Sequence, residues 1–330
     1  MGPGVHLQPP FHSGSNPEIM RLVQRLVLKY IRTKFRLLSS ISKRKAAEKA
    51  FVLFCTPQHR NTKPLPPVFE KAEQLQFGFK GYTVRGYRWN HTPDTKKRAQ
   101  ILHGFESSVV NFDRFVRPLI KKGYEVIAFD APAHGRSSGR TINVLTYKEM
   151  ILYIYKNFGP VSSYIAHSFG GLSLALALEE IAHDSSTRVV FIAPAAETKT
   201  AIDNFFQLLQ LDNGVRTEFD QVIKDIEGKL PDWYSIGRAA GHIRASVLFL
   251  QDRDDHMTPI KDVLPIQKKN LPNFRFIITE GLGHRRIYRD SKLSKEIIEF
   301  LSPIHSLYCW EHFSRAIAWT DFFMECKRIE

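Results

Sequence analysis

The fold of this chain is decided by one stretch, YIAHSFGG at residues 164–171. An apolar run ends in Ser168 and a segment rich in Leu and Ala follows at once, which is the pattern of a strand, a sharp turn and a helix. In such a turn the serine takes a strained backbone conformation that lifts its hydroxyl above a parallel sheet. Ala166 and Gly170 are small, as the close passage of strand and helix requires. The stretch therefore predicts a nucleophilic serine, provided that the chain also supplies a base, an acid and an oxyanion site.

Short apolar runs alternate with helical patterns on both sides of this stretch, which predicts a parallel sheet with right-handed crossovers. We expect a hairpin within 75–89, followed by strands at 99–102, 125–129, 162–166, 188–192, 246–250 and 275–279. Helices are expected at 109–122, 143–158 and 292–301, and another after Pro259. The segment 172–178 alternates Leu with Ala and Ser. Because both of its faces would be largely apolar and Leu and Ala favour helix, we predict a buried helix there.

The chain is expected to have three parts. Residues 1–67 form a leader, a basic helical extension and a linker, residues 68–302 carry the sheet, and residues 303–330 form an extension without an assigned role. Within the middle part, residues 195–243 interrupt the rhythm with helical pieces rich in aromatic side chains. An insertion of this kind is typical of a cap over a pocket. Its aromatic side chains either line an acyl site or pin the insertion to the sheet, and we favour pinning for each residue taken singly.

The composition bounds the class of protein. With 330 residues, of which 43% are hydrophobic, the chain can bury a large core. It contains no apolar run near the roughly 18 residues of a membrane span, and its first residues do not resemble a secretory signal. The three cysteines are few and far apart, which predicts neither a disulfide framework nor a metal cluster. We therefore expect a cytoplasmic protein.

The basic charge is concentrated near the N-terminus. The net charge is +14, and the segment 18–49 holds ten Lys or Arg against two Glu. No groove-reading or base-stacking motif accompanies this charge, so a nucleic-acid partner is not expected. From residue 17 onward, apolar residues recur at helical spacing with cations between them, which predicts a basic amphipathic helix. Residues 17–38 are thus a candidate for peripheral contact with the inner membrane surface, although packing on the protein body is the interpretation we favour. The sequence does not indicate the oligomeric state.

Four landmarks follow one another at the carboxyl ends of predicted strands. They are HGF at 103–105, DAPAHGRS at 130–137, AHSFG at 166–170, and DHMTP at 255–259 followed by GLGH at 281–284. With these motifs the chain from about 99 to 301 resembles an α/β-hydrolase of the serine branch, the superfamily of esterases, lipases and related acyl hydrolases. The resemblance implies a mostly parallel sheet flanked by helices, here with a small helical cap insertion and an extra N-terminal basic helix. Ala166 replaces the usual first glycine and Ala133 stands where glycine is common, but both keep a small side chain.

The order of the landmarks suggests a catalytic triad. Ser168 would be the nucleophile and His284 the base that takes its proton. The acid that orients the imidazole is expected to be Asp255, because its Asp-x-x-Thr-Pro spacing matches the acid loop of the family. Asp252 and Asp254 remain competitors for that role.

The resemblance assigns the oxyanion hole to the backbone amides of Phe105 and Phe169. Four neighbours are expected to support these groups: His103, Gly104, His167 and Gly170. His103 would bind loop backbone and shape the loop that carries the Phe105 amide, while His167 would pack at the sharp turn that carries Ser168.

No cofactor or metal is expected, since the chain lacks Walker-type, Gly-x-Gly-x-x-Gly and His-Glu-x-x-His motifs. The sequence thus predicts a serine hydrolase that cleaves small-molecule carboxylic esters through an acyl-enzyme, as carboxylesterases and lipases do. A serine at this sharp turn argues that the protein is not one of the dehalogenases or epoxide hydrolases of this fold, which have an aspartate at that position. The alternatives are a thioesterase, a lactonase or another acyl hydrolase, and a non-catalytic binding protein on a hydrolase scaffold.

Overall fold

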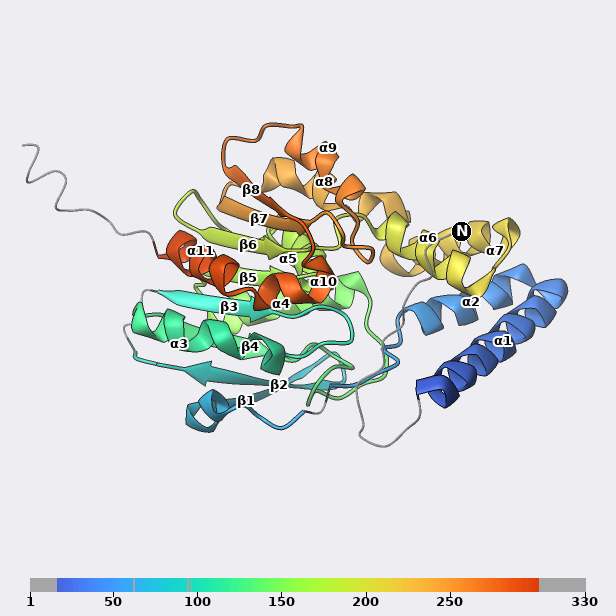
Figure 1. Ribbon diagram of the computed structural model, residues 1–330, viewed down its shortest axis with the longest axis horizontal. Helices are drawn as coiled ribbons and strands as arrows, with labels where there is room; N and C mark the ends of the chain where they lie inside the picture. The colour runs from blue at the N-terminus through green and yellow to red at the C-terminus, as the bar shows by residue number, and fades with distance from the viewer. Residues whose placement is uncertain (1–16, 62, 94, 96, 303–330) are drawn as a thin grey trace, which may run out of the picture.

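The core of the protein is an eight-stranded sheet with the strand order β1-β2-β4-β3-β5-β6-β7-β8 (Figure 1). The computed structural model describes residues 17–302 apart from 62, 94 and 96, with side chains from Val23 onward. The expected leader at 1–16 and the extension at 303–330 lie outside the described residues. The strands are β1 (Glu73–Phe79), β2 (Tyr82–Trp89), β3 (Arg98–Leu102), β4 (Glu125–Phe129), β5 (Ser163–His167), β6 (Arg188–Ile192), β7 (Ser246–Asp252) and β8 (Phe274–Thr279).

The sheet is antiparallel at one edge and parallel elsewhere. β1 and β2 form the predicted hairpin, and β2 runs antiparallel to β4. All remaining neighbours, from β4 through β3 to β8, are parallel. Every residue of β4 and β5 is buried, which explains why residues 126–129 and 164–166 of these strands are continuous apolar runs in the sequence.

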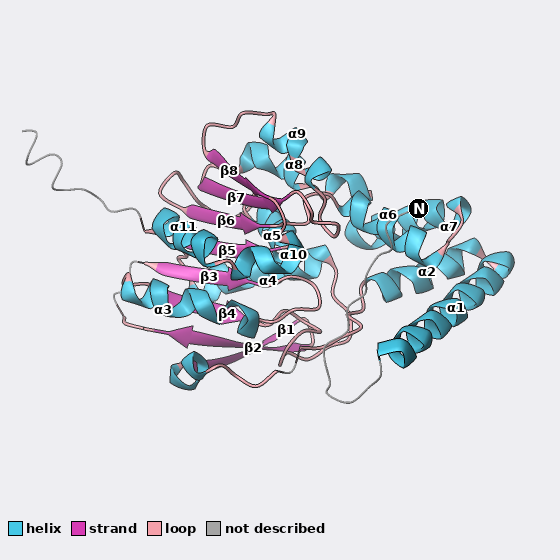
Figure 2. Cartoon of the chain, viewed as in Figure 1, coloured by secondary structure: helices cyan, strands magenta, loops and turns pink. Residues whose placement is uncertain are grey.

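Helices cover both faces of the sheet (Figure 2). On one face lie α3 (Asp113–Lys121) and α11 (Ser291–Leu301), and on the other lie α4 (Val144–Phe158), α5 (Phe169–Ala177) and α8 (Ile236–Ala239). Side chains alternate between the two layers, so that Tyr164 and Ala166 of β5 face α4 and α5 while Ile165 faces the opposite layer. The buried helix predicted after Ser168 is found as α5.

A second group of helices lies beyond the carboxyl ends of the parallel strands (Figure 1). It consists of α1 (Pro17–Ile41), α2 (Lys43–Phe54), α6 (Thr198–Leu209) and α7 (Asn213–Glu227). We call these four helices the cap. In it α2 packs on α7, and α1 packs on α2 and α6.

Phe219 of α7 lies at the centre of the cap and is fully buried. Its ring is 5.9 Å from each of the rings of Phe51 and Phe54 on α2, and 5.1 Å from that of Phe206 on α6. These aromatic side chains of the insertion therefore pack on one another and on the N-terminal helix α2. The sequence led us to expect that they pin the insertion to the sheet, and it did not predict this contact with the N-terminal helices.

Two expected helices differ from the prediction. The helix foreseen at 109–122 starts with a 3-10 turn, Val109–Phe112, before α3 begins. The helix expected after Pro259 is reduced to a 3-10 turn, Ile260–Asp262, and the short helix α9 (Leu264–Gln267). Pro265 has no N–H to continue the preceding turn into α9, so the two pieces stay separate, and Asn270 with a positive φ of 47° lies just beyond the end of α9.

Candidate active site

Ser168 occupies the apex between β5 and α5, with φ 54° and ψ −121°. This is a left-handed conformation that few residues other than glycine adopt, and the surrounding backbone holds it in place. The Ser168 N–H donates to the carbonyl of Ile192 at 3.1 Å, and its own carbonyl accepts from the amide of Ala195 at 3.0 Å. A Cβ at Gly170 would lie 2.5 Å from the carbonyl oxygen of His103, so only glycine fits there. The strained turn predicted from the sequence is present.

His284 lies on α10 (Gly283–Arg286), the short helix after β8. Its Nε2 is 3.0 Å from the Ser168 Oγ, and its Nδ1 is 2.8 Å from the Asp255 Oδ2. Because a carboxylate only accepts hydrogen bonds, the proton belongs on Nδ1, which leaves Nε2 free to accept from the serine hydroxyl. The buried His167 donates from Nε2 to the backbone carbonyl of His284 at 3.1 Å, and burial holds its pKa well below the ordinary value. His167 is therefore a neutral side chain that fixes the segment carrying His284.

Asp255 follows β7, and its side chain is fully buried. Its Oδ1 accepts from the backbone amides of Met257 and Thr258, both at 2.9 Å. Its Oδ2 accepts from His284 and from the Thr258 hydroxyl, the latter at 2.7 Å. Burial alone would raise the pKa of this carboxyl, but the hydrogen bonds from His284 and Thr258 hold the pKa below its ordinary value. Asp255 is thus a carboxylate at neutral pH, in contact with the imidazole.

The two competing acids lie elsewhere in the same turn. Asp252 accepts from the backbone amides of Leu282 and Gly283, at 3.0 and 2.8 Å. Asp254 accepts from a third amide of that loop. Within the described part of the chain, neither carboxylate is hydrogen-bonded to the imidazole of His284. They shape the loop before the histidine, and Asp255 alone of the three contacts its ring.

The loop after β3 passes directly over the nucleophile. A Cβ added at Gly104 would lie 2.8 Å from the Ser168 Cβ and 3.3 Å from its Oγ, so the backbone can come this close only because the residue is glycine. Phe105 is the next residue, and Phe169 is the first residue of α5. Among the described residues neither of these two amides has a hydrogen-bond acceptor. Within the described part of the chain both amides thus lack an acceptor, as the oxyanion role expected of them requires.

Two buried histidines hold the loop that carries Gly104. His103 Nε2 accepts from the amide of Ala131 at 2.9 Å, so its Nδ1–H donates to the Gly104 carbonyl at 2.8 Å. In the same way His134 accepts from the amide of Glu106 at 3.0 Å and donates to a carbonyl two residues before it. Burial lowers the pKa of His103 to about 4 and that of His134 to about 3. Both rings are therefore neutral braces between two loops.

Sequence reasoning did not assign a role to two further residues of the site. The Thr258 hydroxyl lies 2.7 Å from the Asp255 Oδ2 and 3.2 Å from the His284 Nδ1. The Asp-x-x-Thr spacing in the sequence could have predicted the contact with Asp255. Tyr147 of α4 donates its hydroxyl to the His103 carbonyl at 3.1 Å. No pattern in the sequence points to it, because 44 residues separate the two partners.

Comparison with known proteins identifies the fold. The family described as alpha/beta hydrolase fold matches residues 101–224. An esterase of Pyrococcus furiosus superposes with a TM-score of 0.55 at 20% identity, over 75% of this chain and 97% of its own. The chain has the α/β-hydrolase fold. The chain is also similar to a Butyrivibrio proteoclasticus protein solved with ferulic acid bound, with a TM-score of 0.52 at 18% identity, over 69% of this chain and 97% of that one. No curated protein sequence matches the chain.

The fold class predicted from the sequence is confirmed by these matches. At such low identities the likeness concerns the fold and not the substrate.

Proposed function

We propose that the protein is a serine hydrolase that cleaves carboxylic esters through an acyl-enzyme intermediate. The observation that carries this proposal is the continuous hydrogen-bonded chain from the Ser168 hydroxyl through His284 to Asp255, with distances of 3.0 and 2.8 Å. A serine hydroxyl becomes an effective nucleophile when a base takes its proton during attack. The ionised Asp255 holds the imidazole in the tautomer that can do so, and it stabilises the imidazolium that forms.

The reaction then follows from the positions of these groups. Ser168 Oγ attacks the acyl carbon and its proton passes to His284 Nε2. The negative oxygen of the tetrahedral intermediate accepts hydrogen bonds from the amides of Phe105 and Phe169, each worth about 2.7–4 kcal/mol in comparable sites. His284 gives its proton to the departing alcohol. Water, deprotonated by the same Nε2, then attacks the acyl-enzyme, and the acid leaves as Ser168 regains its proton.

Apolar surface beside the nucleophile supports an acyl group of apolar character. The rings of Phe105 and Phe169 meet edge to face with their centroids 5.8 Å apart, directly next to the loop and turn that carry the two amides. The amide-bearing residues thus also supply aromatic surface. We propose a small-molecule ester with a short to medium apolar acyl chain as the substrate.

A serine-directed fluorophosphonate probe tests the nucleophile independently of the substrate. We expect wild type to be labelled at one residue, Ser168, and Ser168→Ala to remain unlabelled. Ser173→Ala is the matched control, because Ser173 lies on the next turn of α5 and its hydroxyl donates to the Phe169 carbonyl, its only hydrogen-bond partner among the residues that the structure describes. It should label like wild type. A folded wild-type protein that is not labelled would point to a binding protein on a hydrolase scaffold.

A panel of substrates tests the bond that is cleaved. Nitrophenyl esters of increasing acyl length are compared with thioesters and lactones of the same acyl groups. The proposal expects the highest kcat/KM for an ester. A clear preference for a thioester or a lactone would keep the acyl-enzyme chemistry and replace the ester by that substrate class.

A further inference from the structure

Helix α1 is attached to the cap by one side only. Leu28, Ile31 and Leu38 are partly buried and pack on the core, and Phe35 is fully enclosed. At 3.6 residues per turn these four residues share one face of the helix. Arg32 at the margin of this face donates from Nε and Nη2 to the carbonyl of Leu208 on α6, at 3.1 and 2.8 Å. The position of α1 on the protein is thus defined by packing and by hydrogen bonds.

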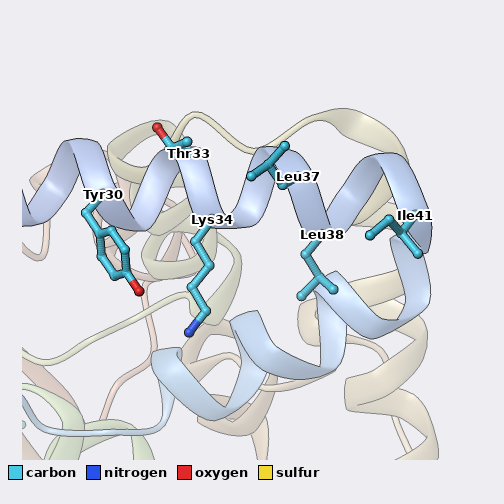
Figure 3. Close-up of a pocket in the computed structure, with 6 residues that line it drawn as sticks. All are labelled: Tyr30, Thr33, Lys34, Leu37, Leu38 and Ile41. Atoms are coloured by element: carbon cyan, nitrogen blue, oxygen red, sulfur yellow. The ribbon is translucent and has the colours of Figure 1, made fainter.

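Another side of α1 exposes apolar side chains to solvent. Six of them lie along this side at helical spacing, interrupted by one turn that carries Thr33 and Lys34, and we call them the α1 stripe: Val23, Leu26, Val27, Tyr30, Leu37 and Ile41. Each is more than half exposed, whereas elsewhere in the described surface only Val52, Ile226 and Met257 among the large apolar side chains exceed half exposure, at scattered positions. A groove of ≈ 430 Å³ runs along the C-terminal half of the helix, lined by members of the stripe together with Thr33, Lys34 and Leu38 (Figure 3). An apolar surface of this extent marks an interaction site.

Cations border the α1 stripe. Arg25, Lys29 and Arg36 are exposed and lie along one flank of it at helical spacing, and Lys34 lies within it. Among the described residues none of these four cations takes part in an ion pair. By contrast, the first two cations of α2 form ion pairs with acidic side chains at both ends of α7. Lys43 and Arg44 of α2 thus serve the fold, whereas these four cations of α1 are directed at solvent.

We propose that α1 docks the protein onto the surface of a bilayer that contains anionic phospholipid, lying parallel to the membrane plane. The α1 stripe would enter the boundary between headgroups and acyl chains, and the bordering cations would contact lipid phosphates. Within residues 17–302, no helix combines the length and apolarity that crossing a membrane requires. A second copy of the chain is a poor occupant, because its own α1 would bring another set of unpaired cations against these.

Docking in this way turns a defined side of the protein toward the membrane. Since α1 packs on α2 and α6, the cap faces the bilayer, and α3 and α11 face away from it (Figure 1). This proposal concerns binding and does not depend on the proposed reaction.

Flotation of the full chain with vesicles tests the proposal. We expect the protein to float with vesicles that contain about one-third phosphatidylglycerol, and much less with pure phosphatidylcholine. Raising the salt concentration should weaken the binding, because the exposed cations are screened.

The double variant Leu26→Ser/Leu37→Ser tests the contribution of the α1 stripe to membrane binding. Both residues are exposed, so the variant should fold like wild type, while the partition coefficient should fall by about tenfold or more. Met257→Ser/Leu264→Ser is the matched control, because these apolar side chains are also exposed but lie outside the cap. The control should float like wild type.

The triple variant Arg25→Gln/Lys29→Gln/Arg36→Gln tests the contribution of the bordering cations to membrane binding. Each cation near an anionic surface contributes roughly a fivefold gain in partition, so the variant should bind about a hundredfold more weakly. The control Lys121→Gln/Lys122→Gln removes exposed cations at the end of α3 and should bind like wild type.

Three results would overturn the proposal. One is a wild-type protein that does not float with anionic vesicles, and another is equal binding by wild type and both α1 variants. The third is a dimer in solution that Leu26→Ser/Leu37→Ser dissociates, since a second copy would then cover the α1 stripe. Fluorophosphonate labelling separates this proposal from the hydrolase proposal. If the protein floats with vesicles but is not labelled, the membrane proposal stands and the hydrolase proposal is refuted.

Discussion

Replacing Asp255 by Asn is expected to reverse the hydrogen bonding of His284. In the native protein Oδ1 faces two backbone N–H groups, those of Met257 and Thr258, at 2.9 Å each. An asparagine has one acceptor oxygen, and these two donors require it at the Oδ1 position. The side-chain NH2 then takes the position of Oδ2 and donates to His284 Nδ1. The imidazole must carry its proton on Nε2, where it can no longer accept from Ser168.

The neighbouring threonine allows this arrangement. The Thr258 hydroxyl now donates to the Asp255 Oδ2, but it also lies 3.2 Å from the carbonyl of Ala193. It can donate to that carbonyl and accept from the new NH2, so the asparagine keeps its partners and the protein should remain folded. The loss therefore falls on catalysis and not on stability.

The expected size of the loss is about 10⁴-fold in kcat, which corresponds to about 5.4 kcal/mol of transition-state stabilisation. The measurement is kcat on the best ester, together with the second-order rate of fluorophosphonate labelling. Asp254→Asn is the control, because Asp254 accepts from a single loop amide and an asparagine oxygen can do the same. It should stay within a few-fold of wild type. If Asp255→Asn keeps activity within a few-fold of wild type, the assignment of Asp255 as the acid is refuted.

Three further outcomes follow from the same geometry. Gly104→Ala should reduce activity at least about a hundredfold, because its Cβ would lie 2.8 Å from that of Ser168 and displace the oxyanion loop; unchanged kcat would contradict the close approach. The pKa values of His103 and His134 are lowered in the folded state, so the unfolded chain binds more protons and the free energy of unfolding should fall as pH drops from about 6.5 towards 4, by up to about 1.4 kcal/mol per pH unit for each histidine. Urea denaturation across this range measures the slope, and a flat profile would show that the rings are not held neutral. Phe219→Ala empties the centre of the cap and should cost about 3–5 kcal/mol in the same assay, whereas a cost below about 1 kcal/mol would mean that the cap is loosely packed.

Much of the fold and part of the candidate site could be predicted because they rest on local patterns. The apolar run before Ser168 and the Leu/Ala run after it specify a strand and a helix by periodicity and propensity. Small residues two positions to either side allow the turn between them. Thr258 could have been assigned from the same kind of local spacing, since it lies three residues after Asp255.

What the sequence by itself determined is the order and type of the elements and the identity of the serine and histidine that the fold brings together. Only the tertiary structure decided which of three neighbouring aspartates contacts His284, because one turn aims their carboxylates in different directions. It also decided that the N-terminal helices join the insertion in one cap, and that α1 buries a single face and leaves the α1 stripe in solvent. A helical repeat shows that a helix is amphipathic, but which face is covered depends on partners distant in the chain, and one-dimensional periodicity contains no information about them.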